Sequence, residues 1–162
     1  MELFNNSTLQ EIGVLLIDRK ETLAVAESVT SGAIQLAISN IKNASRFFQG
    51  GITAFNIMQK FHHLAVEPMH ALEVNCVSEE VARQMALNVA KRFSSTWAIS
   101  ITGYAVPAPE SGGQVFAYYA VAYNGKVMSC AKIDPQEDEP VKLQLFYANE
   151  VCERLKDALL VK

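Results

Sequence analysis

The sequence predicts an α/β fold, a single layered domain in which helices cover both faces of one mixed β-sheet. Two observations favour this class. Helical and strand-like segments alternate through the N-terminal part of the chain, as they do in sheets with helical crossovers. A hairpin signal, Asn124-Gly125, then follows between two apolar segments, so antiparallel strands should join the parallel ones.

The chain has 162 residues, of which 50% are hydrophobic and 19% are charged. This length and composition favour one globular domain, residues 1–162. The formal net charge is −3 and no dense run of Lys or Arg occurs, which argues against nucleic-acid binding. Since the N-terminus lacks a signal-peptide pattern and no apolar stretch could span a bilayer, we expect a soluble cytoplasmic protein without a membrane partner.

The first elements are a helix, a strand and a second helix. Thr8 and Glu11 have the spacing of a capping box, which predicts a helix from residue 7 or 8 to residue 20. The apolar run 23–26 predicts a buried strand. A helix should follow from Ala33 and end near residues 40–43, where the sequence turns polar.

A short helical turn over 45–49 and a strand over 52–55 come next. Asn56 and Gln59 then have the spacing of a second capping box, so a helix should begin after Asn56. Further on, Ser78 is a good N-cap before two acidic residues, and an apolar stripe predicts a helix that continues to about Phe93.

A buried strand is expected over 97–101, followed by an irregular loop over 102–113. A loop of this length in a small domain often borders a functional site, although it could be an ordinary connector. The Asn124-Gly125 turn should join strands over 114–123 and 126–133. The last helix should begin near Pro140, because proline is tolerated in a first helical turn.

The turn after the first strand is the main candidate site, because Ser28, Thr30 and Ser31 lie there before Gly32. A helix N-terminus offers unpaired N–H groups and a positive dipole end, which suit a carboxylate, a phosphate or an oxyanion. A serine at this point could bind an anion or act as a nucleophile. The alternative is that these hydroxyls only cap the helix.

Lys60 is the second candidate, because it lies one turn into a helix that begins at a strand end. Its flexible stem could return the amine over that strand end. The three histidines and three cysteines show no metal-ligand spacing. We therefore expect neither a metal site nor a cofactor.

Four motifs, in this order, resemble the CinA C-terminal domain family, which includes PncC-like nicotinamide mononucleotide deamidases. The motifs are AESVTSG at 26–32, FFQGGITAFNIMQK at 47–60, NCVSEEVARQMA at 75–86 and ISITGYA at 99–105. The resemblance covers about Ser7 to Leu159 and implies an α/β domain that forms homo-oligomers, dimers or larger. It also implies an amidohydrolase that converts nicotinamide mononucleotide and water to nicotinate mononucleotide and ammonia, in pyridine-nucleotide recycling.

The resemblance assigns the nucleophile to Ser28 and the catalytic base to Lys60. It implies that a nucleotide-like small molecule binds beside them. The substrate-binding positions that we expect on this basis are Glu27, Thr30, Ser31, Gly32, Phe55, Thr102 and Gly103.

Several positions depart from the family pattern. Val29 replaces a cysteine, Ser31 replaces a glycine that would let a ligand approach closely, and Phe55 replaces a tyrosine. A glycine-rich stretch becomes Val106-Pro107-Ala108-Pro109-Glu110, and the acidic segment 136–139 stands in place of an arginine-bearing one. Carboxylates there should weaken phosphate binding.

These departures leave other functions open beside the amidohydrolase. One is a catalytically impaired member, a binding or oligomeric scaffold that keeps the fold and pocket. Another is a purely structural association protein, suggested by the aromatic strand around Phe116 and Tyr123.

Overall fold

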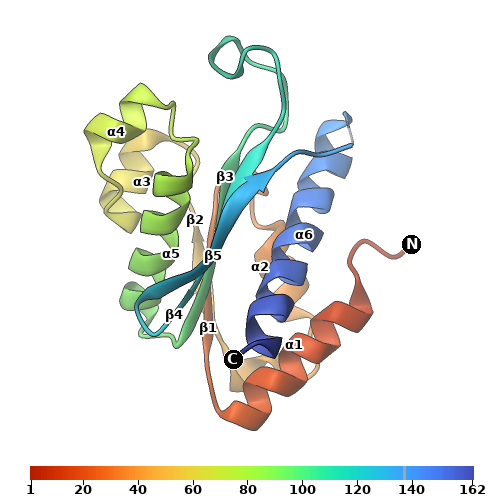
Figure 1. The fold of residues 1–162 in the computed structure, drawn as a ribbon. Helices are drawn as coiled ribbons and strands as arrows, with labels where there is room; N and C mark the ends of the chain where they lie inside the picture. The colour runs from red at the N-terminus through yellow and green to blue at the C-terminus, as the bar shows by residue number, and fades with distance from the viewer. Residues whose placement is uncertain (137) are drawn as a thin grey trace.

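The computed structural model describes residues 1–136 and 138–162, which form a five-stranded mixed sheet between two layers of helices (Figure 1). The strands are β1 (Leu23–Glu27), β2 (Phe48–Thr53), β3 (Trp97–Gly103), β4 (Ala117–Tyr123) and β5 (Lys126–Ile133). The helices are α1 (Asn6–Arg19), α2 (Ala33–Ser39), α3 (Ile57–Leu64), α4 (Pro68–Glu73), α5 (Glu79–Phe93) and α6 (Pro140–Leu160). Within these residues, none of the helices is both long and apolar enough to cross a membrane.

The strand order is β2-β1-β3-β4-β5. β1 lies between β2 and β3 and runs parallel to both, whereas β3, β4 and β5 pair antiparallel. Helices α3, α4 and α5 cover one face of the sheet, and α1, α2 and α6 cover the other (Figure 1). The predicted α/β class, with a mixed sheet and helices on both faces, is confirmed.

The two faces of the sheet carry side chains of different size, because alternate residues of a strand point to opposite faces. Large apolar side chains face α1, α2 and α6; they include Leu23, Val25, Trp97, Ile99, Tyr119 and Val121. Alanines face α5, namely Ala24, Ala26, Ala98, Ala120 and Ala122. The small side chains let α5 lie close to the sheet, where the Ser100 hydroxyl donates a hydrogen bond to the carbonyl of Ala82. This close packing fixes the segment that leads into α5.

The first helix begins differently from the prediction. The side chain of Asn5 is the N-cap and accepts a hydrogen bond from the amide of Thr8 at 3.2 Å. Thr8 lies inside the helix, where its hydroxyl donates to Glu153 of α6. The prediction that Thr8 caps the helix was wrong, since Asn5 caps it one turn earlier by accepting from the amide of Thr8 itself.

Strand β2 spans Phe48–Thr53, whereas we predicted a strand over 52–55. Gly50 and Gly51 both belong to the strand. A Cβ atom added at Gly51 would lie 2.5 Å from the carbonyl oxygen of Val25, so only glycine allows this approach of β2 to β1. Because the strand ends at Thr53, Phe55 leaves the sheet before α3 begins.

Helix α4 was not predicted, although Glu67 caps it by accepting from the amides of Met69 and His70, and Pro68 occupies its first turn. Its six residues are too few to show a clear apolar period. The predicted starts of the helices after Asn56 and Ser78 and at Pro140 are confirmed. Strand β5 matches its predicted bounds, while β4 begins at Ala117 rather than at residue 114.

Candidate functional site

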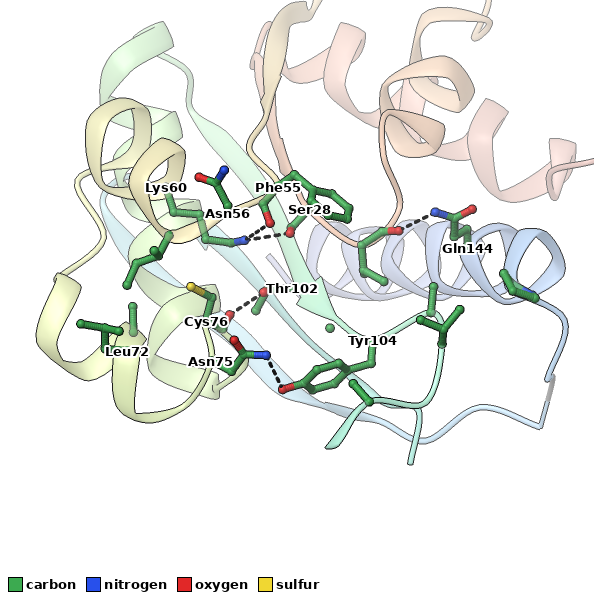
Figure 2. Close-up of a pocket in the computed structure, with 18 residues that line it drawn as sticks. Ser28, Phe55, Asn56, Lys60, Leu72, Asn75, Cys76, Thr102, Tyr104 and Gln144 are labelled. Atoms are coloured by element: carbon green, nitrogen blue, oxygen red, sulfur yellow. Dashed lines mark hydrogen bonds between the residues drawn. The ribbon is translucent and has the colours of Figure 1, made fainter. Parts of the chain in front are cut away.

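The carboxyl ends of β1 and β3 meet at one edge of the sheet, which is where parallel α/β sheets generally bind ligands. Ser28 follows β1 directly, and its amide donates to the carbonyl of Ile101 in β3 at 3.1 Å. A cavity of about 620 Å³ opens at this edge. Its wall combines the turn after β1, the start of α3, the segment between α4 and α5, the loop after β3 and the start of α6 (Figure 2).

Ser28 and Lys60 contact each other on the cavity wall. The amine of Lys60 donates to the Ser28 hydroxyl at 2.8 Å and to the carbonyl of Phe55 at 3.4 Å (Figure 2). Only 5% of Ser28 and 2% of Lys60 are exposed. The side chain of Asn56 caps α3 by accepting from the amide of Gln59, which fixes the turn that carries Lys60.

The environment of Lys60 favours its neutral form. Burial lowers the pKa of the Lys60 amine, and the nearby Cys76 thiol opposes part of this shift. A neutral amine within hydrogen-bond distance of a serine hydroxyl can accept its proton, so this pair has the geometry of a nucleophile and its base.

Glu27 is fully buried, and its carboxylate accepts four hydrogen bonds from the start of α2. The donors are the Thr30 hydroxyl at 2.6 Å and the amides of Gly32, Ile34 and Gln35 at 3.2, 2.9 and 2.9 Å. The cap of α2 is therefore a carboxylate, not the serine hydroxyls considered from the sequence. It occupies the anion site that this helix N-terminus would otherwise offer to a ligand.

The structure brings some expected site residues to the cavity and leaves others outside. Ser28, Phe55, Lys60, Thr102 and Gly103 belong to the wall. The other expected positions, which do not line the cavity, are Glu27, Thr30, Ser31 and Gly32. Ser31 is exposed in a left-handed conformation with φ of 52°, so its side chain does not narrow the cavity. The Thr102 hydroxyl donates to the carbonyl of Cys76 at 2.6 Å, which gives it a structural contact.

Phe55 lies at the mouth of the cavity with 76% of its surface exposed. Its backbone carbonyl contacts Lys60, but its ring supplies no polar group. Any contact that a tyrosine hydroxyl makes at this position in relatives is therefore not available from residue 55.

Sequence reasoning missed Gln144, Asn75 and Tyr104, which all line the cavity. The Gln144 side chain amide donates to the carbonyl of Val29 at 2.9 Å and so fixes the turn that carries Ser28. Asn75 and Tyr104 lie in two of the motifs quoted above and could have been considered there. Gln144 carries no sequence signal, because a glutamine on a helix is ordinarily exposed.

The acidic segment 136–139 includes Glu137, which lies outside the described residues. Glu139 precedes the first turn of α6, and its carboxylate lies 3.1 Å from the amine of Lys142. Pro140, the next residue, is part of the cavity wall, whereas Glu139 does not line it. Among residues 1–136 and 138–162, no group of three or more His, Cys, Asp or Glu residues is arranged to hold a metal ion.

Comparison with known proteins identifies the domain. A family model described as the CinA C-terminal domain matches residues 5–150. A CinA-like protein of Synechococcus sp. is 42% identical over 103 residues, which are 64% of this chain and 24% of the relative. A CinA-like protein of Rippkaea orientalis is 34% identical over 126 residues, or 78% of this chain and 30% of the relative. The chain thus matches a quarter to a third of the length of these relatives.

Solved structures share the fold at lower identity. A CinA superfamily protein from Klebsiella pneumoniae superimposes with a TM-score of 0.91 at 20% identity, and the match covers 100% of both chains. A competence/damage inducible protein from Agrobacterium tumefaciens gives 0.83 at 22% identity and covers 98% of this chain and 99% of that one. With the family match over most of its length and this fold, the chain belongs to the CinA C-terminal domain family.

Proposed function

We propose that this protein is an amidohydrolase that removes ammonia from a ring carboxamide such as that of nicotinamide mononucleotide, with Ser28 as nucleophile and Lys60 as base. The observation that carries the proposal is the 2.8 Å contact between the Ser28 oxygen and the Lys60 amine on the wall of a ligand-sized cavity. Burial lowers the pKa of Lys60, so more of the amine is available in its neutral, basic form.

The first half of the reaction forms an ester and releases ammonia. The Ser28 oxygen attacks the carboxamide carbon while the neutral Lys60 amine accepts the hydroxyl proton. The carbonyl oxygen becomes an oxyanion. When this intermediate collapses, the C–N bond breaks and Lys60 returns its proton to the departing nitrogen, which leaves as ammonia. Ser28 then carries the acyl group.

In the second half, water replaces ammonia. Lys60, neutral again, takes a proton from water, whose oxygen attacks the ester carbon. The C–O bond to Ser28 breaks, Lys60 returns the proton to the serine oxygen, and the carboxylic acid leaves. The sum is amide plus water giving acid plus ammonia, so the protein ends in its starting state.

Backbone amides next to Ser28 suit the oxyanion. In the part of the chain that the structure describes, the amides of Val29 and Thr30 donate no hydrogen bond within the protein. Val29 lines the cavity, and Gln144 holds its carbonyl in place. Fixed donors of this kind contribute about 3–4 kcal/mol of barrier reduction in known enzymes.

The test is ammonia release from nicotinamide mononucleotide and a panel of ring carboxamides. We expect turnover by the native protein and a loss of at least about 10³-fold in Ser28→Ala. Ser31→Gly is the matched control, since it removes an exposed hydroxyl from the same turn and favours the left-handed backbone; its rate should stay within about twofold. Equal rates in the native and Ser28→Ala proteins would contradict the proposal.

Phe55 favours a second candidate, a scaffold that binds the ligand without turning it over. The exposed Phe55 ring lacks the hydroxyl expected for the family. No other hydrogen-bond donor is assigned to the reaction at this position. This candidate predicts ligand binding by calorimetry with no ammonia release from any amide. The homo-oligomer expected from the resemblance stays a prediction, which sedimentation velocity checks directly.

A further inference from the structure

A second polar pair lines the same cavity, apart from Ser28 and Lys60. The side chain amide of Asn75 donates to the Tyr104 hydroxyl at 3.2 Å. In Figure 2, Thr102 and Cys76 lie between this pair and Ser28. The cavity therefore has a reactive polar pair in one part of its wall and an uncharged polar pair in another.

The backbone holds Asn75 in an uncommon conformation. Asn75 and Cys76 both have positive φ, 50° and 61°, in the left-handed region that side chains other than Asn and Asp rarely adopt. Two contacts fix this turn: the amide of Cys76 donates to the carbonyl of Ala71 at 2.7 Å, and Thr102 donates to the carbonyl of Cys76. These contacts hold the turn that carries Asn75 in one conformation.

Tyr104 is held just as firmly. The hydroxyl of Tyr147 donates to its carbonyl at 3.0 Å, and the ring of Phe116 packs edge-on against the Tyr104 ring with centroids 5.3 Å apart. Both members of the pair are thus positioned by the fold before any ligand arrives, which reduces the entropy lost on binding.

The pair keeps hydrogen-bonding capacity for a ligand. The side chain nitrogen of Asn75 donates to the Tyr104 hydroxyl. In the described part of the chain, the side chain oxygen of Asn75 accepts from no donor, and the Tyr104 O–H donates to no acceptor. An exposed acceptor beside a free O–H donor suits a vicinal pair of sugar hydroxyls, each of which can both donate and accept.

Charges near the cavity act against a phosphate. The N-terminus of α2 already binds the Glu27 carboxylate. At the start of α6, the acidic residue Glu139 directly precedes Pro140 of the wall, and Pro140 has no backbone N–H to offer. The Glu139 carboxylate also engages the nearby cation, Lys142. The negative charge of Glu139 raises the cost of bringing a phosphate to the start of α6.

We propose that the preferred ligand is an unphosphorylated, nucleoside-like carboxamide, whose amide reaches Ser28 while its sugar hydroxyls bind Asn75 and Tyr104. This inference rests on the proposed amidohydrolase function. It predicts that the protein prefers a nucleoside to the corresponding nucleotide, whose sugar carries a phosphate.

The kinetic test compares nicotinamide riboside with nicotinamide mononucleotide, which differ only in the phosphate. We expect kcat/KM to be at least about tenfold higher for the riboside. Asn75→Gly, which keeps the left-handed backbone, and Tyr104→Phe should each lower riboside kcat/KM about fivefold, the effect of one hydrogen bond. The losses should be clearly smaller for free nicotinamide, which has no sugar. A preference for the mononucleotide, or equal losses on all three amides, would overturn the inference.

The effect of the Glu139 charge can be tested separately. Glu139→Gln should raise kcat/KM for the mononucleotide several-fold without changing that for the riboside, and added salt should reduce the gain. Glu150→Gln is the matched control, because Glu150 forms a similar pair with Arg154 elsewhere on α6. An equal gain in the control would contradict a local effect of Glu139.

Calorimetry separates failure of this inference from failure of the proposed function. With Ser28→Ala, which stops turnover, the riboside should bind at least about tenfold more tightly than the mononucleotide. This holds whether or not the native protein hydrolyses either compound. Tighter binding of the mononucleotide, or no binding of the riboside, overturns the inference.

Discussion

Glu27 and Lys60 are both ionisable side chains buried at the carboxyl end of β1, but their surroundings differ. The Glu27 carboxylate accepts four hydrogen bonds, three of them from backbone amides at the start of α2. The Lys60 amine contacts one hydroxyl at 2.8 Å and one carbonyl at 3.4 Å, with no carboxylate among these partners. Protein hydrogen-bond donors therefore replace water around the Glu27 carboxylate, whereas the Lys60 amine has only two polar partners.

The different surroundings favour a structural role for Glu27 and a reactive role for Lys60. The buried Glu27 side chain accepts several hydrogen bonds from the start of α2 and so orders the turn. A buried amine with few acceptors is easier to deprotonate, and burial accordingly lowers the pKa of Lys60. In the proposed mechanism, the same strand end positions Ser28 through Glu27 and activates it through Lys60.

The largest effect should come from Lys60→Met, which removes the amine but keeps an unbranched apolar side chain. We expect kcat for amide hydrolysis to fall about 10³-fold, since general-base catalysis contributes about 10²–10⁴. Lys91→Met on the exposed face of α5 is the control and should leave kcat unchanged. A Lys60→Met protein with near-native turnover would remove Lys60 from the mechanism.

The pH dependence of this pair has a definite sign. As the base, Lys60 must be neutral, so kcat/KM should rise with pH through its lowered pKa. Between that folded-state pKa and the ordinary value of 10.5, the unfolded chain binds more protons, so the native protein gains stability as pH rises. Below the folded-state pKa, the penalty for the buried ammonium is complete. Lys60→Met should therefore be more stable than the native protein at neutral pH, and thermal melts across pH check this.

Glu27→Gln should have a smaller effect, on stability rather than on catalysis. The substitution replaces one acceptor oxygen by an NH2 group that would face backbone donors at Ile34 or Gln35. We expect a loss of about 2–3 kcal/mol in the free energy of unfolding. Denaturant titration measures it, with Glu150→Gln as a half-buried control that changes little. If Glu27→Gln instead keeps its stability and loses only activity, then Glu27 belongs to the chemistry.

The smallest effect concerns Phe55→Tyr at the mouth of the cavity. If the family hydroxyl supports the serine–lysine pair, restoring it should raise kcat about threefold while the free energy of unfolding stays within about 0.5 kcal/mol, since the side chain is mostly exposed. Phe55→Leu is the matched control without a hydroxyl. Steady-state kinetics on one carboxamide settles the comparison, and an equal change in both variants would leave the hydroxyl without a role.

Local patterns determined much of the fold. The N-cap signals of Asn56 and Ser78, the Asn124-Gly125 turn and the apolar period after Pro140 all act over a few residues, so the sequence was enough to place those elements. The same locality explains the errors. The extent of β2 depends on the close approach of Gly51 to Val25 in a neighbouring strand. The start of α1 depends on whether Asn5 or Thr8 is the N-cap, and residue spacing alone does not decide between them.

For the site, the sequence by itself determined which groups were available, a serine after a buried strand and a lysine one turn into a later helix. Only the tertiary structure decided that they meet, because parallel pairing of β1 with β2 brings the chain after each strand to the same edge. It also decided that Glu27, not a ligand, occupies the N-terminus of α2, and that Asn75, Tyr104 and Gln144 face one cavity. Burial and hydrogen-bond partners come from residues distant in the chain, so no local pattern encodes them.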